Sequence, residues 1–224
     1  AGLPFIAPDY STAWLLKDLA KGYIDNAFKE KGLKILYYTP WPGQGFYTKF
    51  PVNSTSDFKG KKLRIYSTAT QKMGQMLGFN ATILPFAEIP QAFSTGLIEA
   101  LFTSPQTGID IQAWDNTKHF TYAGAIFSKN AVVVGEKYFS ALSANDQSNM
   151  LAAAARAELR GWEMSAATTV AQMAILKKNG MTVVNAPDSV ITKMKEIGKE
   201  MMAGWRKDAS PEAIAVLDRY LALQ

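Results

Sequence analysis

The sequence predicts an α/β fold with two lobes bridged by a long helix, and three observations lead to this expectation. Residues 57–108 alternate short apolar strands with short helices, an order that implies a parallel sheet with right-handed crossovers. Residues 143–180 form one continuous helical pattern without a heptad repeat, which suits a strut between lobes better than a coiled coil. The chain has 224 residues, enough for one large or two modest domains.

The composition is that of an ordinary globular protein and excludes several classes of function. Hydrophobic residues make up 48% of the chain and charged residues 19%, enough apolar material to bury a core. The net charge is +5, but the basic residues are spread along the chain and form no stripe of the kind that binds nucleic acid. No apolar run reaches the roughly 18 residues of a membrane-spanning helix. We therefore expect no nucleic-acid partner and no membrane-embedded segment.

Catalytic and metal-binding motifs are missing from the sequence. It contains no cysteine and His119 is its only histidine, which excludes disulfides, thiol catalysis and His/Cys metal sites. We read His119 as a surface residue or a satisfied core histidine. There is no nucleophile elbow or P-loop, and Gly43-Gln44-Gly45 lacks the third glycine of a dinucleotide fingerprint. The sequence predicts neither an enzyme nor a bound cofactor or metal.

The first part of the chain predicts a helix, a strand and a rigid turn. Residues 12–30 place apolar side chains on one helical stripe, and residues 33–38 read as a strand. Residues 39–45, TPWPGQG, form a turn whose prolines and glycines fix the backbone and allow a close approach. This turn, which contains Gln44, is either a rigid crossing between lobes or a ligand contact. Residues 46–48 look extended.

The alternating block predicts where a ligand would bind. Apolar strands are expected around residues 63–65, 82–84 and 98–102, with a helix that ends at Gly78 and a short helix at residues 86–94 between them. Ligands of parallel sheets bind beyond the carboxyl ends of the strands. That edge is therefore the expected site.

The rest of the chain predicts mostly helices. We expect a helix at residues 108–121, a buried strand at 131–134, the long helix that starts at Ser143, a strand at 181–184, a helix at 188–205 and a last helix capped by Ser210. No internal repeat or low-complexity tail is present.

Arg64 is the sharpest candidate for a binding residue. If Leu63 and Ile65 face a core, Arg64 and Tyr66 point to the opposite side of the strand. A guanidinium matches a carboxylate in two parallel hydrogen bonds, each worth roughly 1.5–3 kcal/mol. The alternative is a surface arginine among neighbouring lysines.

Other candidates lie at the ends of the next two strands. Phe86 follows Pro85, where its ring either packs on a ligand or fills the core. Thr103, Ser104 and Gln106 supply small donors and acceptors, or form a plain polar turn.

Three segments resemble the solute-binding proteins of tripartite ATP-independent periplasmic (TRAP) transporters, of the C4-dicarboxylate-binding type. They are DFKGKKLRIYS at 57–67, Leu77-Gly78 followed by Phe86-Ala-Glu88, and FSTGLIEA at 93–100. The resemblance covers the whole chain and is looser outside these segments. Because the family is longer at its amino end and this chain opens at Ala-Gly-Leu-Pro-Phe, we expect that the start of the natural protein is missing.

The resemblance implies a two-lobed, periplasmic binding protein-like fold that closes on its ligand around a hinge. We assign residues 1–41 plus 129–168 to lobe I, which would be incomplete at its amino end, and residues 42–128 plus 169–224 to lobe II. The resemblance also implies a periplasmic location, TRAP membrane permease subunits as partners and a small carboxylate as ligand.

The resemblance also assigns roles in the site. In the family, the arginine that matches Arg64 grips the ligand carboxylate, and the aromatic that matches Phe86 packs on the ligand. Residues that match Thr103 and Ser104 line the cleft. The full set predicted to bind the ligand is Gln44, Phe46, Arg64, Tyr66, Ser67, Phe86, Thr103, Ser104 and Asn130.

Two departures from the family pattern bear on the ligand. Gln44 stands nearest to where some members have a second arginine, and Thr103 stands where an asparagine often contacts the ligand. Both remove polar or cationic capacity. We predict a monocarboxylate with an apolar or aromatic body, such as an aromatic or 2-oxo acid, instead of a dicarboxylate or sialic acid.

The predicted function is a periplasmic receptor that captures a small organic acid and delivers it to the permease. One alternative is a sensor of the same fold that reports the ligand to another protein. An enzyme on this scaffold would need an acid/base set, which the sequence does not supply.

Overall fold

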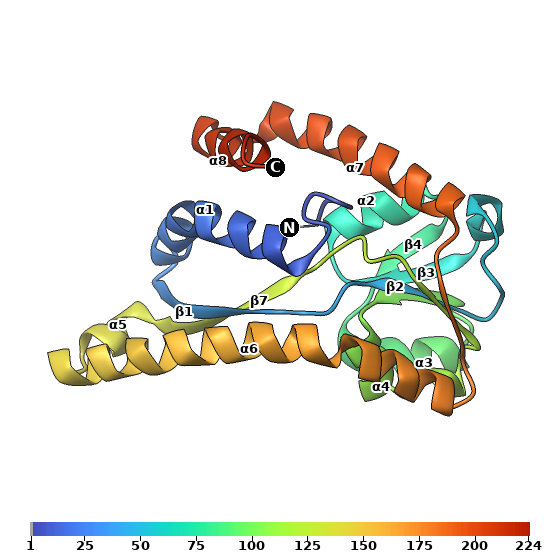
Figure 1. The fold of residues 1–224 in the computed structure, drawn as a ribbon, viewed down its shortest axis with the longest axis horizontal. Helices are drawn as coiled ribbons and strands as arrows, with labels where there is room; N and C mark the ends of the chain where they lie inside the picture. Colours follow the sequence, from blue (N-terminus) through green and yellow to red (C-terminus); the bar gives the residue numbers. More distant parts are fainter. Residues whose placement is uncertain (1) are drawn as a thin grey trace.

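The fold is described for residues 2–224 in a computed structural model. Along the chain, with η marking a turn of 3-10 helix, its elements are α1 (Tyr10–Lys29), β1 (Leu33–Pro40), β2 (Gly45–Thr48), η1 (Thr55–Phe58), β3 (Lys62–Ile65), α2 (Thr68–Met76), β4 (Asn80–Ile83), η2 (Phe86–Glu88), α3 (Ile89–Ser94), β5 (Ala100–Thr103), α4 (Pro105–Asp110), η3 (Ala113–Asp115), β6 (His119–Tyr122), β7 (Lys129–Gly135), α5 (Glu136–Ser140), α6 (Ala144–Lys178), β8 (Thr182–Asn185), α7 (Asp188–Asp208) and α8 (Pro211–Leu221). The strands form two separate sheets, and helices pack around both (Figure 1).

The larger sheet has six strands in the order β4-β3-β5-β2-β6-β8. β3 runs parallel to β4 and β5, as the alternation in residues 57–108 predicted. β2 lies between β5 and β6 and is antiparallel to both. The carboxyl ends of β3, β4 and β5 therefore meet at one edge of the sheet.

Alternation along β3 sends its side chains to two environments. Leu63 and Ile65 are fully buried in the largest apolar core, as predicted, whereas Arg64 lies on the other side of the strand. Phenylalanine rings pack together in this core; the centroids of Phe46 and Phe58 lie 4.8 Å apart. Burying each such ring contributes about 1.5–3 kcal/mol to the free energy of folding. The strand that carries Arg64 is thus firmly anchored.

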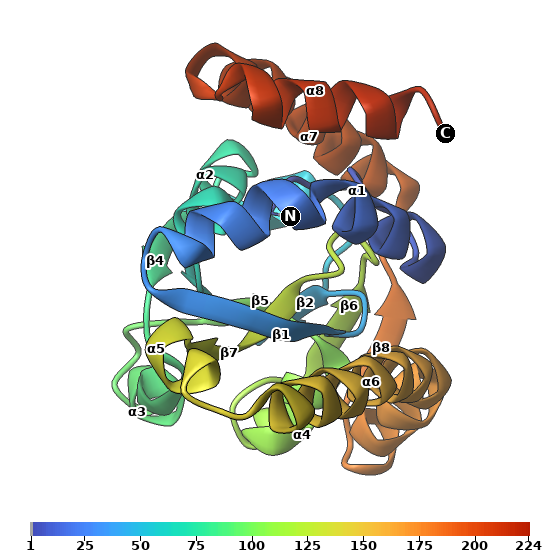
Figure 2. The same ribbon diagram turned by 90° about the vertical axis from the view of Figure 1, so that its left-hand side faces the viewer.

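The smaller sheet is an antiparallel ribbon of β1 and β7. α1 and α6 both pack on β1, and Figure 2 shows them on opposite sides of the ribbon. The strand predicted at 131–134 is present as part of β7, but it is not buried as expected: Val133 is 39% exposed. The two helices pack on β1 more than on β7, which leaves part of β7 exposed.

A partly buried ion pair joins the elements around this ribbon. Lys17 on α1 is only 3% exposed, and its Nζ lies 3.0 Å from Glu158 Oε2 and 2.9 Å from Asp18 Oδ1. The other oxygen of Glu158 accepts a hydrogen bond of 2.9 Å from the backbone N–H of Tyr38 on β1. Glu158 therefore ties α6 to both α1 and β1.

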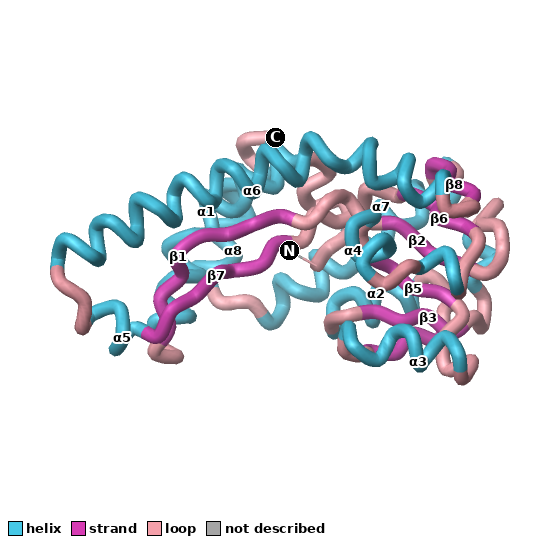
Figure 3. Tube along the Cα trace, turned by 90° about the horizontal axis from the view of Figure 1, so that it is seen from below, coloured by secondary structure: helices cyan, strands magenta, loops and turns pink. Residues whose placement is uncertain are grey.

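The predicted bridging helix is confirmed as α6, which has 35 residues. Ser143 caps it by accepting a hydrogen bond from the backbone N–H of Asp146. α6 packs on β1 in one part of the molecule and on α4 and β8 in the other, and Figure 3 shows it running alongside both sheets. No helix within residues 2–224, α6 included, has both the length and the apolar character needed to cross a membrane.

The helix predicted at residues 108–121 is wrong for most of its length. α4 begins earlier and ends at Asp110, and His119–Tyr122 form β6 instead. Pairing of β6 with β2 and β8 outweighs the local helical pattern there.

The division into lobes remains a proposal. α7 packs on α2 and η1, whereas α8 packs on α1. We therefore keep α7 with residues 42–128 but place α8 with lobe I, in place of the single 169–224 assignment.

Candidate functional site

A cavity of about 580 Å³ opens at the edge where β3, β4 and β5 end. This volume lies within the roughly 300–1,000 Å³ typical of small-molecule sites. The residues that line it are Trp41, Gln44, Arg64, Tyr66, Phe86, Thr103, Ser104, Thr107, Asp110, Ser128, Lys129 and Asn130. Seven of the nine residues predicted to bind the ligand are in this set.

Arg64 is the most constrained charged group of the cavity wall. It is 5% exposed, and its Nε donates a hydrogen bond of 3.1 Å to the carbonyl of Leu84. Burial lowers the pKa of the Arg64 guanidinium, an effect that the nearby Tyr66 partly opposes. Within residues 2–224 no carboxylate forms an ion pair with it. A buried cation without a counter-charge is a suitable site for an anion.

Tyr66 and Gln44 form a hydrogen-bonded wall beside Arg64. The Tyr66 hydroxyl donates to Gln44 Oε1 at 2.8 Å, and Gln44 Nε2 donates to Ser128 Oγ at 2.9 Å. Burial raises the pKa of Tyr66 to about 12, so the hydroxyl keeps its proton at neutral pH. Gln44 therefore shapes the wall and adds no charge where some relatives were expected to have arginine.

The end of β5 supplies hydroxyl groups. Ser104 caps α4, because its Oγ accepts a hydrogen bond of 3.2 Å from the backbone N–H of Thr107. The hydroxyls of Ser104 and Thr107 lie 3.1 Å apart. Thr103, the last residue of β5, is buried and also lines the cavity. The polar turn predicted from the sequence is thus the wall of the cavity and the start of a helix.

Besides Tyr66, two aromatic residues border the cavity, Phe86 and Trp41. Phe86 on η2 is 52% exposed, so its ring is not part of the core. Trp41, from the proline-rich turn, donates through Nε1 to Asn130 Oδ1 at 3.3 Å. Asn130 is the second residue of β7, and this contact places the turn against that strand.

Phe46 and Ser67 were predicted to bind the ligand, but the structure places them outside the cavity. Phe46 is fully buried between strands β5 and β6, and its ring packs on Phe58 and Phe102. Ser67 caps α2 by accepting a hydrogen bond from the backbone N–H of Thr70. Their side chains have structural roles, so we remove both from the proposed site.

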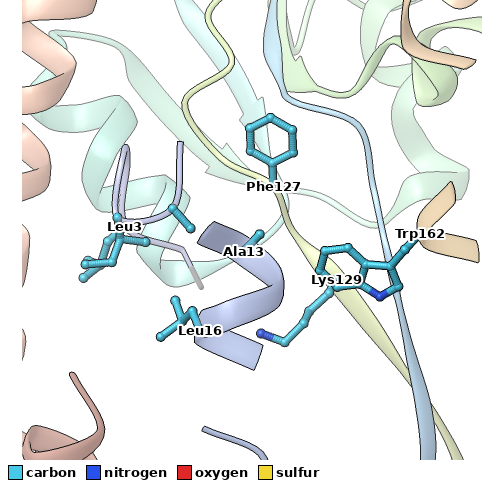
Figure 4. Close-up of a pocket in the computed structure, with 8 residues that line it drawn as sticks. Leu3, Ala13, Leu16, Phe127, Lys129 and Trp162 are labelled. Atoms are coloured by element: carbon cyan, nitrogen blue, oxygen red, sulfur yellow. The ribbon is translucent and has the colours of Figure 1, made fainter. Parts of the chain in front are cut away.

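Lys129 is a second cation at the cavity and was missed by sequence reasoning. It also lines a small apolar cavity beside α1, where Figure 4 shows its side chain extending from β7 toward that helix, near Leu16 and Trp162. Burial lowers the pKa of the Lys129 amine, and the charge of Lys17 lowers it further. No acidic side chain of residues 2–224 forms an ion pair with it.

The other lining residues that the sequence did not reveal are Trp41, Thr107, Asp110 and Ser128. The sequence predicted that the rigid turn at residues 39–45 could contact the ligand. Trp41 lies in this turn, so the same prediction could have been extended to its side chain. Ser128 carries no signal in the sequence. No group of three or more acidic, His or Cys side chains that could hold a metal occurs in the described part of the chain.

Comparison with known proteins gives a consistent result. A family model for "bacterial extracellular solute-binding protein, family 7" matches residues 1–208. The C4-dicarboxylate-binding periplasmic protein DctP of Rhodobacter capsulatus is 24% identical over 221 residues, 93% of this chain and 60% of that protein. The ectoine/5-hydroxyectoine-binding periplasmic protein UehA of Ruegeria pomeroyi is 24% identical, covering 87% of this chain and 58% of that protein. The chain thus spans about 60% of the length of these curated relatives.

Solved structures agree more closely. DctP7, a Bordetella pertussis extracytoplasmic solute receptor binding pyroglutamic acid, superposes with a TM-score of 0.95 at 36% identity, covering 97% of this chain and 72% of that one. A marine metagenome TRAP solute binding protein specific for pyroglutamate gives a TM-score of 0.93 at 32% identity, covering 98% and 72% of the two chains. These superpositions confirm the predicted periplasmic binding protein-like α/β fold.

The relatives are receptors for solutes and not enzymes, in agreement with the missing catalytic motifs. The resemblance found in the sequence is confirmed by a family match that spans most of the chain. This chain therefore belongs to family 7 of the bacterial extracellular solute-binding proteins, the family of the TRAP transporter receptors.

Proposed function

We propose that the protein is the periplasmic receptor of a TRAP transporter and captures a small monocarboxylic acid in the cavity around Arg64. The buried guanidinium carries this proposal, because a ligand carboxylate would supply the counter-charge that Arg64 lacks among residues 2–224. Two parallel charge-assisted hydrogen bonds would hold it. Among residues 2–224 only Nε of Arg64 donates a hydrogen bond, so its terminal nitrogens are available to the ligand.

The composition of the wall favours a compact acid with one carboxylate. Gln44 is neutral and hydrogen-bonded within the protein, and Thr103 presents only a hydroxyl. The Phe86 ring offers an apolar face for the body of the ligand. Three solved structures more than 30% identical to this chain are described as binding pyroglutamate or pyroglutamic acid, a monocarboxylate with a small ring. Pyroglutamate is therefore the first ligand to test, followed by aromatic and 2-oxo acids.

Binding would be coupled to closure of the two lobes. Arg64, Phe86 and Thr103 belong to the larger sheet and its loops, whereas Lys129 and Asn130 lie on the strand of the smaller sheet. A ligand that contacts both groups has a higher affinity for a closed arrangement and shifts the population toward it. The closed receptor would then deliver the acid to the membrane permease.

The relatives support the proposed periplasmic location and permease partners. The curated proteins reported above are named as periplasmic binding proteins. They are not described as signalling proteins, so they do not favour the sensor alternative.

Isothermal titration calorimetry with a panel of acids tests the proposal. We expect saturable binding of pyroglutamate or another monocarboxylate, and no binding of succinate or sialic acid at the same concentrations. Native mass spectrometry of the purified protein should show the same class of acid bound. Binding of dicarboxylates or sugar acids alone would contradict the monocarboxylate assignment, and binding of no acid would contradict the receptor function.

A further inference from the structure

The cavity around Arg64 carries charges of both signs. Arg64 and Lys129 are cationic, and Asp110 is the one carboxylate among the described residues that line it. The oxygens of the Asp110 carboxylate can accept hydrogen bonds from a ligand.

The start of α4 directs Asp110 to the cavity. Ser104, Thr107 and Asp110 follow each other at intervals of three residues, which places them on one face of the helix. All three line the cavity. The helix begins at a defined point, because Ser104 caps it. Asp110 is therefore the last group of a polar face that starts at the end of β5.

Gln106 and Gln172 orient the Asp110 carboxylate through hydrogen bonds. Gln106 Nε2 donates to Asp110 Oδ1 at 2.7 Å, and Gln106 Oε1 accepts a hydrogen bond of 2.9 Å from Gln172 Nε2. Gln172 lies on α6 and is only 7% exposed. Among residues 2–224, Asp110 Oδ2 has no hydrogen-bond or ion-pair partner. One oxygen is thus used to orient the group, and the other is available to a ligand.

We infer that Asp110 recognises an N–H group of the ligand, so that the protein selects monocarboxylic acids that carry an N–H donor over acids of the same shape without one. The inference rests on the proposed function and narrows its ligand class. An N–H group that meets Oδ2 makes a charge-assisted hydrogen bond. A ligand oxygen in the same place would face the carboxylate with its lone pairs and lose that bond.

A ligand pair that differs at one position tests this inference. Pyroglutamate and its lactone analogue share the ring, the carbonyl and the carboxylate, but the lactone has a ring oxygen in place of the N–H. Calorimetry on the purified protein should show the lactam binding about tenfold tighter or more, because hydrogen bonds to charged groups are the stronger kind. Proline is a third ligand to compare. If it binds more tightly than the lactone, Asp110 also accepts a hydrogen bond from the ring ammonium group.

Asp110→Asn provides the matching variant. The asparagine keeps the shape and still accepts from Gln106, but its amide can donate to the lactone oxygen. The ratio of the lactone and lactam dissociation constants should therefore fall to about threefold or less, since the charge-assisted hydrogen bond to the ligand N–H is lost. Asp115→Asn makes the same change of charge at an exposed position of η3 outside the cavity and should keep the wild-type preference.

The outcomes separate this inference from the function on which it rests. Equal affinity of the wild-type protein for lactam and lactone, or an unchanged preference in Asp110→Asn, would overturn the role of Asp110 and leave the receptor function standing. Failure of every monocarboxylate to bind the wild-type protein would overturn both.

Discussion

Arg64 Nε donates a hydrogen bond of 3.1 Å to the backbone carbonyl of Leu84, two residues before Phe86. This bond connects β3 to the segment that follows its parallel neighbour β4. It orients the guanidinium and leaves the terminal nitrogens to the cavity, next to the exposed ring of Phe86. Charge and apolar surface are thus brought together by one pair of strands, which suits a ligand with a carboxylate at one end and an apolar body at the other.

Arg64→Ala should abolish most of the binding of a monocarboxylate. Losing two charge-assisted hydrogen bonds is expected to weaken affinity by about 100-fold or more, roughly 3 kcal/mol. Arg64→Lys keeps the charge but not the planar fork, so its affinity should fall between those of the wild-type protein and the alanine variant. Calorimetry with pyroglutamate measures all three.

Arg160→Ala is the control for this series, because Arg160 is exposed on α6 and lies outside the cavity. It removes the same formal charge and should leave the dissociation constant unchanged. If Arg64→Ala retained wild-type affinity while remaining folded by circular dichroism, the carboxylate anchor would have to be sought elsewhere.

Tyr66→Phe should destabilise the fold through the hydrogen bond to Gln44. The variant leaves the buried Gln44 Oε1 without its donor, which is expected to lower the free energy of unfolding by about 1–3 kcal/mol. Urea denaturation followed by circular dichroism measures this change. Tyr138→Phe, at a position 75% exposed, should have no measurable effect. Equal denaturation midpoints for both variants would mean that the Tyr66 hydroxyl is satisfied in some other way.

The part of the site that could be predicted from sequence depends on short-range patterns. Alternation in β3 directed Arg64 away from the core, and the parallel order of β3 and β5 placed Thr103 at the same edge. Both follow from two-residue periodicity and from strands that alternate with helices. Long-range pairing was invisible to such patterns. Phe46 was misplaced because β2 lies between β5 and β6 in the sheet, and its ring packs into the apolar core on Phe58 and Phe102.

Helix boundaries explain the missed residues Thr107 and Asp110. The sequence pattern suggested a helix from residue 108 onward, whereas α4 starts at Pro105. Once Ser104 is known as the cap, the three-residue spacing places both side chains on the cavity face. Lys129 was missed for a different reason: it lies at the start of β7, where the smaller sheet borders the cavity, and a strand pattern does not report how two sheets lie relative to each other.

Glu158→Ala should destabilise the protein much more than other acidic substitutions on α6. The change leaves the buried ammonium of Lys17 with Asp18 alone and removes the acceptor of the Tyr38 N–H. Because Lys17 is buried whereas Glu158 is 20% exposed, the free energy of unfolding is expected to fall by roughly 1–3 kcal/mol. Glu163→Ala, at an exposed position of the same helix, is the matched control and should change it little. Equal effects of the two substitutions in urea denaturation would contradict a structural role for this pair.

Lys129→Met should stabilise the protein without ligand at neutral pH, and the gain should disappear in alkaline solution. Burial and the charge of Lys17 hold the pKa of Lys129 below its usual range, so the folded state binds fewer protons than the unfolded state between the two pKa values. Wild-type stability therefore rises with pH across that interval. The destabilising effect of the charged amine is complete below the folded pKa and is lost above the unfolded pKa of roughly 10.4.

Thermal unfolding midpoints of the wild type and Lys129→Met should accordingly converge as pH rises, whereas Lys31→Met, at an exposed position, should show no such convergence. A gap that stays constant with pH would attribute the effect of Lys129→Met to packing of the methionine and not to removal of the buried charge.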